Sequence, residues 1–223
     1  MQKIMFNDRY GLTDAVLDGR KTMTRRFITR HPQDCSESHK HCWGADWANE
    51  PMRLVYDEKE NAMYCRYCGN GVRWDGGYLL RPAYKVGEEV AVAQSYEMIR
   101  NCMTIGDPLL PEWTASSAGW RNKMFVKAEM MPHRIRITGI RAERLQDISD
   151  EDCIKEGVIE HPYSGYMVDG IVYKGRIDDG YNGSLRIFDT PREALAALID
   201  KVSGRGTWAS NPWVVAYEYE LVK

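Results

Sequence analysis

A basic segment near the start of the chain holds residues whose types and spacing suit chemistry. Its five cations occur with no acid between them: Arg20, Lys21, Arg25, Arg26 and Arg30. Thr22 and Thr24 lie among them. Such a run is typical of a solvated surface, of an edge that binds phosphate, or of a catalytic centre. In the last case the neighbouring cations would disfavour the charged form of Lys21, so that its amine acts as a base or nucleophile.

A second segment, 143–156, has the opposite charge. Its acids are Glu143, Asp147, Asp150, Glu151, Asp152 and Glu156, against the two bases Arg144 and Lys155. If it faces the basic segment, the two make a polar cleft. The alternative, which charge alone favours, is a pair of unrelated solvated faces.

The chain around the basic segment must turn if its side chains are to meet. Apolar residues at helical spacing predict a short helix over 11–18, and Gly19 suits the position after its end because glycine readily adopts positive φ. In a regular strand, Lys21 and Thr24 would point to opposite faces. The two side chains therefore converge only if the chain turns after Gly19.

The acidic segment contains a predicted helix. Ser149 is a suitable N-cap, Asp152 follows three residues later, and Gly157 marks the end. Glu156 then lies in the last turn, where a carboxylate faces the negative end of the helix dipole. Its place is explained either by solvent exposure or by a role in a site.

The remaining patterns predict the fold class. Alternating apolar residues indicate strands within 84–97, 122–130, 133–145 and 211–222. The most regular helix covers 189–204, with Thr190 as N-cap and Gly204 as its stop, whereas 99–121 and 159–187 are expected to be loops. The strands follow one another without regular crossover helices, which favours an α+β domain with a mainly antiparallel sheet or barrel.

Composition narrows the class of protein. The chain has 223 residues, 43% hydrophobic and 28% charged, which is enough for one domain with a real core. Its formal net charge of −2 differs from that of a dedicated duplex-DNA binder. The sequence contains neither an apolar run of membrane-spanning length nor the apolar region of a signal peptide. We expect a cytoplasmic protein with no membrane partner.

A Cys- and His-rich segment, 31–82, has weak apolar periodicity and is expected to be an insertion with little core of its own within a single domain, 1–223. Two ligand pairs about two dozen residues apart fit a structural zinc site. The preferred ligands are His39, Cys42, Cys65 and Cys68, with Cys35 as the competitor for the histidine. The metal would stabilise a segment that lacks a core. The alternative is a set of ordinary reduced cysteines.

The basic segment resembles the signature of the ASCH family (activating-signal-cointegrator homology domains), which reads Gly-x-Lys-x-x-(Glu or Thr)-x-Arg after a first helix. Gly19, Lys21, Thr24 and Arg26 match it in order. Segments 1–30, 82–98, 123–158 and 188–223 are similar to the family, and the layout is similar to its long phage and prophage members. The resemblance implies a PUA-like fold, a small mainly antiparallel β-barrel flanked by helices, with a cleft beside the signature.

The resemblance also implies recognition of RNA or of a modified nucleoside. Some small bacterial members are amidohydrolases that remove the acetyl group from N4-acetylcytidine. Their proposed catalytic set is a Lys and a Thr of the signature and a Glu of the acidic helix. Motif position carries these roles onto Lys21, Thr24 and Glu156.

Further residues are expected to contact the substrate, namely Arg20, Arg25, Arg26 and Trp120. Trp208 and Trp213 are, with Trp120, candidates to stack a base. Two other functions remain open. One is a non-catalytic module in which the cations hold the phosphates of single-stranded RNA, and the other is a phage-associated interaction protein with a vestigial cleft.

The zinc site generates the first prediction. Protein purified without added zinc is expected to contain about one equivalent of the metal by elemental analysis, because four ligands close a structural site. Cys68→Ser should lose the metal, whereas Cys102→Ser, which changes a cysteine outside the predicted set, should keep it. Wild-type protein without zinc would refute the site.

Overall fold

Five strands form one mixed sheet at the centre of the molecule. The computed structural model describes residues 1–28, 54–65, 81–103, 110–172 and 185–222. The strands are β1 (Lys3–Ile4), β2 (Met23–Phe27), β5 (Glu89–Val92), β6 (Arg134–Arg144) and β9 (Trp213–Val222), in the order β1-β5-β6-β9-β2. β1 runs parallel to β5, and the other neighbours are antiparallel. The predicted α+β class is confirmed.

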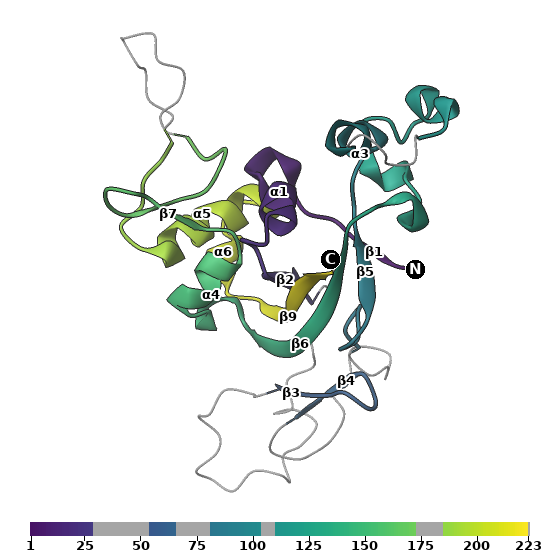
Figure 1. Ribbon diagram of the computed structural model, residues 1–223. Helices are drawn as coiled ribbons and strands as arrows, with labels where there is room; N and C mark the ends of the chain where they lie inside the picture. The colour runs from purple at the N-terminus through teal and green to yellow at the C-terminus, as the bar shows by residue number, and fades with distance from the viewer. Residues whose placement is uncertain (29–53, 66–80, 104–109, 173–184, 223) are drawn as a thin grey trace, which may run out of the picture.

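The longest strands, β6 and β9, pair along most of their lengths. Their register shifts between Ile137 and Gly139. An irregularity of this kind bends the strand that carries it. Figure 1 shows β6 as a long curved ribbon that passes around β9. Strand β2 pairs with the other edge of β9, which brings the basic segment into the sheet.

The helices gather mainly on one side of the sheet. In Figure 1, α1 (Leu12–Leu17), α4 (Asp150–Lys155), α5 (Pro191–Ser203) and α6 (Thr207–Ser210) lie together, and α3 (Tyr96–Cys102) stands apart. The two predicted N-caps are confirmed: Thr190 accepts a hydrogen bond from the backbone N–H of Glu193, and Ser149 accepts one from Asp152. Leu195 of α5 is buried in the main core.

The described part of the Cys- and His-rich segment is a hairpin. Strand β3 (Leu54–Asp57) pairs with β4 (Ala62–Cys65) in antiparallel register. Leu54 and Met63 are buried in the same core cluster as the central sheet. The hairpin therefore gains its apolar burial from the main core, consistent with a segment that has little core of its own.

The strand predicted within 122–130 is wrong. Two 3₁₀ turns lie there, η3 (Lys123–Phe125) and η4 (Ala128–Met130). The ammonium of Lys3 donates hydrogen bonds to the backbone carbonyls of Lys123, Met124 and Val126. A distant lysine thus satisfies carbonyls that a strand would have paired in a sheet.

The expected loops also contain short elements. Helix α3 overlaps the start of 99–121, capped by Ser95, and the 3₁₀ turn η2 (Glu112–Ser116) lies further along. Strands β7 (Ile159–Glu160) and β8 (Tyr166–Met167) form a two-residue ladder within 159–187. Two further 3₁₀ turns are η1 (Asp8–Tyr10) and η5 (Leu145–Asp147). In the described parts of the chain, every helix is too short or too polar to cross a bilayer.

Candidate functional site

Lys21 is held in the turn that joins α1 to β2. Gly19 has a φ of +74°, the left-handed conformation expected just after a helix. The backbone N–H of Lys21 donates to the carbonyl of Ala15 at 2.8 Å. Strand β2 begins only at Met23, so the alternation of a strand does not govern the side chain of Lys21. The turn that the sequence required is present, and both Lys21 and Thr24 line one cavity.

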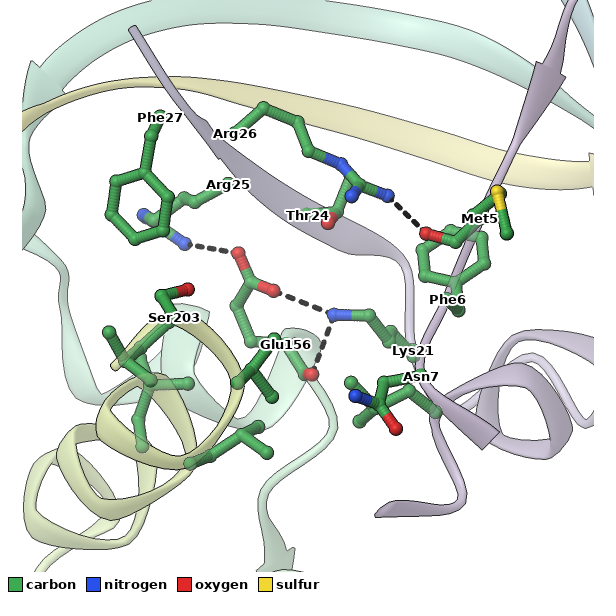
Figure 2. Close-up of a pocket in the computed structure, with 15 residues that line it drawn as sticks. Met5, Phe6, Asn7, Lys21, Thr24, Arg25, Arg26, Phe27, Glu156 and Ser203 are labelled. Carbon is green, nitrogen blue, oxygen red and sulfur yellow. Dashed lines mark hydrogen bonds and ion pairs between the residues drawn. The ribbon is translucent and has the colours of Figure 1, made fainter. Parts of the chain in front are cut away.

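The side chain of Lys21 ends on Glu156. Lys21 Nζ donates to Glu156 Oε2 at 2.6 Å and to the backbone carbonyl of Glu156 at 2.6 Å (Figure 2). It also donates to the backbone carbonyl of Met23 at 2.8 Å. Lys21 is 2% exposed and Glu156 is 6% exposed. Three acceptors match the three N–H donors of a lysine ammonium. The structure therefore brings together two predicted catalytic residues from distant parts of the chain.

Burial lowers the pKa of the Lys21 amine below its ordinary value of 10.5, because the charged form loses its hydration. The carboxylate of Glu156 opposes this effect, since it favours the ammonium. The positive charges of Arg26 and Arg25 lower the pKa further. The crowding of positive charge in the basic segment also predicted a lowered pKa for Lys21, although burial is the largest cause. Lys21 is thus more easily deprotonated than a lysine in water.

Arg25 holds the carboxylate of Glu156 from the other side. Its Nη1 lies 3.1 Å from Glu156 Oε1, its Nε 2.7 Å from Glu143 Oε1 and its Nη2 3.1 Å from Asp152 Oδ2. The side chain of Arg25 is 1% exposed. Arg25 also lines the cavity, so its expected contact with substrate stays a prediction. Three carboxylates surround its guanidinium, which makes it a positioning residue for Glu156.

A second arginine extends this ion network across the sheet. Arg141 of β6 lies 2.9 Å from Glu143 through its Nε, and it also pairs with Asp152 and Glu218. Glu143, Asp152 and Glu156 of the acidic segment are therefore paired with arginines of β2 and β6. This also explains Glu156 at the end of α4, because Lys21 and Arg25 offset the unfavourable helix dipole. The polar cleft inferred from the two charged segments is present.

The Lys21–Glu156 pair lies in a cavity of about 320 Å³. This volume is near the lower end of the range for small-molecule sites, about 300–1,000 Å³. Thr24 and Arg26 of β2 line it, as do Phe6 and neighbouring residues of the N-terminal segment (Figure 2). One face of α5 completes it. Lys21, Thr24, Arg26 and Glu156 thus share one cavity of nucleoside size.

Arg26 lies at the side of the cavity opposite α5. Its Nη2 donates to the backbone carbonyl of Met5 at 2.6 Å. Its guanidinium carbon is 5.7 Å from the centre of the Phe6 ring, and Lys21 Nζ is 5.8 Å from that centre. Both distances are within the range of cation–π attraction. Phe6 therefore helps to position two cations of the site.

Two of the expected substrate contacts lie elsewhere. Arg20 is exposed and pairs with Asp18 at 3.2 Å. Trp120 packs against the cluster around Tyr96, with the guanidinium carbon of Arg100 5.7 Å from its ring centre. Neither Arg20 nor Trp120 is among the residues that line the cavity.

The other candidate tryptophans also lie outside the cavity. Trp213 is buried in the main core, and the guanidinium carbon of Arg144 lies 4.7 Å from its ring centre. Trp208 packs against the same core and is partly buried. Both rings serve packing, and neither lines the cavity.

The predicted zinc ligands fall largely outside the described residues. His39, Cys42 and Cys68 lie there, as does the competitor Cys35. The backbone of Cys65 is described and ends β4. Within the described ranges, no group of three or more His, Cys, Asp or Glu side chains is arranged to hold a metal ion. Zinc stays a prediction from the sequence.

Comparisons with known proteins do not assign a family. No family model, curated protein or solved structure matches the chain. The ASCH resemblance therefore remains a prediction, carried by the signature at 19–26.

Sequence reasoning missed Phe6 and the lining face of α5. A phenylalanine in an N-terminal segment carries no signal for a site, and the stripe of α5 looks like an ordinary core face. The roles of Asp152 and Glu143 had a signal, since both lie in the acidic segment. Their partner Arg25 was identified as a cation of the site that contacts substrate.

The ion network predicts a large difference between two arginines. Arg25→Gln is expected to lower the free energy of unfolding by about 3–5 kcal/mol, because it leaves buried carboxylates without their cation. Arg20→Gln, at an exposed position, should change it by less than about 0.5 kcal/mol. Urea denaturation of the wild type and the two variants measures both changes in the free energy of unfolding. Equal effects would contradict the positioning role.

Proposed function

We propose that this protein is an ASCH-type amidohydrolase that removes the acyl group from N4-acylated cytidine. The single observation that carries the proposal is the buried contact between Lys21 and Glu156, in a cavity that Thr24 also lines. A lysine with a lowered pKa that contacts a carboxylate beside a hydroxyl is a typical arrangement for acid–base chemistry. The ASCH resemblance implies the same three residues, with Lys21 and Thr24 in the signature and Glu156 in the acidic helix.

The Lys21–Glu156 contact supports a closed proton cycle. Transfer of one proton across the 2.6 Å contact gives a neutral amine and a protonated carboxyl. The amine keeps two N–H donors for the backbone carbonyls of Met23 and Glu156. Its lone pair faces the protonated carboxyl, so that carboxyl rotates toward the leaving nitrogen, and the lone pair can then remove a proton from a water molecule held by the hydroxyl of Thr24.

Hydrolysis then proceeds with its atoms balanced. The water oxygen adds to the acyl carbon, and the carbonyl oxygen becomes an oxyanion that Arg26 neutralises. The C–N bond breaks, and Glu156 gives its proton to the leaving nitrogen of cytidine. Lys21 holds the proton from water, so the ammonium–carboxylate pair is restored. The products are cytidine and a carboxylic acid.

The PUA-like fold is part of the same proposal. Two features support it: the signature joins the first helix to an edge strand, and the closing strand β9 pairs with that strand. The helices α1, α4 and α5 flank this part of the sheet (Figure 1). The resemblance implies a cleft beside the signature, and the cavity lies beside the signature residues.

Binding of single-stranded RNA by the basic segment has less support. Its phosphate contacts would come from Arg20, Lys21, Arg25 and Arg26. Lys21 and Arg25 are instead buried against carboxylates, Arg20 lies outside the cavity, and Arg26 lines the cavity and donates to the carbonyl of Met5. A small neutral ligand fits this charge arrangement better than a polyanion does.

The proposed activity predicts that the protein releases cytidine and acetate from N4-acetylcytidine. Chromatography of the reaction mixture measures both products. Lys21→Ala should reduce kcat/KM by at least about 100-fold, since it removes the general base. Lys201→Ala alters an exposed lysine of α5 outside the cavity and should retain the wild-type rate. Absence of turnover by the wild type would refute the substrate assignment.

The lowered pKa of Lys21 predicts the pH dependence of this reaction. The Lys21–Glu156 pair holds one shared proton, which Glu156 gives to the leaving nitrogen, so kcat/KM should fall as the pH rises through the pKa of Lys21, with a midpoint below 10.5. Arg26→Gln removes a positive charge that lowers this pKa, so the midpoint should move to higher pH. A midpoint that stays in place in Arg26→Gln would contradict this assignment of the base.

A further inference from the structure

The cavity has two chemically different halves on either side of Glu156 (Figure 2). The first half is lined mainly by apolar side chains, which are Phe27 of β2 and Leu195, Leu198, Ile199 and Val202 of α5, with Ser203 and the guanidinium of Arg25 on the same side of Glu156. The second half is lined by the N-terminal segment Met5–Asn7 and by Arg26. It offers the amide of Asn7 and the guanidinium of Arg26 as hydrogen-bonding groups.

The apolar half continues the stripe of α5 beyond the core. Leu195 and Leu198 are buried, Ile199 is half-buried, and Val202 is 45% exposed. The stripe thus passes from the core onto the wall of the cavity. A single exposed valine needs no explanation, but a continuous apolar wall beside a buried ion pair favours an apolar ligand group.

The geometry of an amide relates these halves to the substrate. A secondary amide is planar and trans, so its acyl chain and its nitrogen substituent point in opposite directions. If the scissile bond lies at Lys21 and Glu156, one substituent must enter each half. The polar edge of a pyrimidine would lose hydrogen bonds against aliphatic side chains, whereas an acyl chain would lose none.

We infer that α5 forms an acyl-binding wall and that the Arg26 half receives the pyrimidine, so that the preferred substrates carry an aliphatic acyl chain longer than acetyl. This inference rests on the proposed function and adds the substrate's orientation and chain length to it. The bond that breaks is still the C–N bond, and water supplies the oxygen of the released fatty acid. Each added methylene gains contact with α5 and leaves the Arg26 half unchanged.

Chain-length preference tests the inference directly. Wild-type kcat/KM is measured for N4-acetylcytidine and N4-hexanoylcytidine, and the hexanoyl substrate is expected to exceed the acetyl one by roughly tenfold or more, since one buried methylene alone discriminates about 10–200-fold. Val202→Asp should lower this ratio to about one, because it places a charge on the acyl wall. The matched control is Val55→Asp in β3, where the valine is 46% exposed and lies outside the cavity.

The outcomes separate the inference from the proposed function. Turnover of the acetyl substrate with no gain for hexanoyl overturns the acyl wall and leaves the amidohydrolase in place. Turnover of neither substrate overturns both. A ratio that falls equally in Val202→Asp and Val55→Asp overturns the wall, whereas a fall in Val202→Asp alone supports it.

Discussion

The site depends on one buried ion network, in which Lys21 and Arg25 hold the carboxylate of Glu156 between them. Removing charges from water costs several kcal/mol per ion, so such a network persists only where every donor and acceptor is matched. Here the ammonium has three acceptors and the guanidinium has three carboxylate partners. The network fixes the end of α4 against β2 and β6, and the shape of the cavity follows from that contact.

The same network divides the basic segment into separate tasks. Arg25 and Arg26 both line the cavity, whereas Arg20 remains on the surface. The two strand arginines differ in role because Arg25 is bonded to carboxylates and Arg26 donates to the carbonyl of Met5. Lys21 lies before the start of the strand. Its burial lowers its pKa, which supplies the property that a catalytic lysine needs.

Lysines elsewhere show how distant contacts decide local structure. Segment 122–130 has the alternating pattern of a strand, yet it forms 3₁₀ turns whose carbonyls accept hydrogen bonds from Lys3. Lys123 of the same segment donates in turn to the carbonyl of Phe6 and to Asp8. These bonds connect the turns to the N-terminal segment that lines the cavity. A local pattern cannot contain this information, because both partners are more than a hundred residues away.

Local signals in the sequence were sufficient for the caps of α4 and α5 and for the turn at Gly19. Each of these rests on neighbouring residues. The family resemblance, and not a local signal, led us to expect Lys21, Thr24 and Glu156 in one cavity. Only the tertiary structure decided that Arg25 faces carboxylates, that Trp120 lies away from the cavity and that α5 lines it with aliphatic side chains. The physical reason is that an ion pair or a cavity wall needs partners from separate segments. The packing of those segments determines which face of each element meets the other.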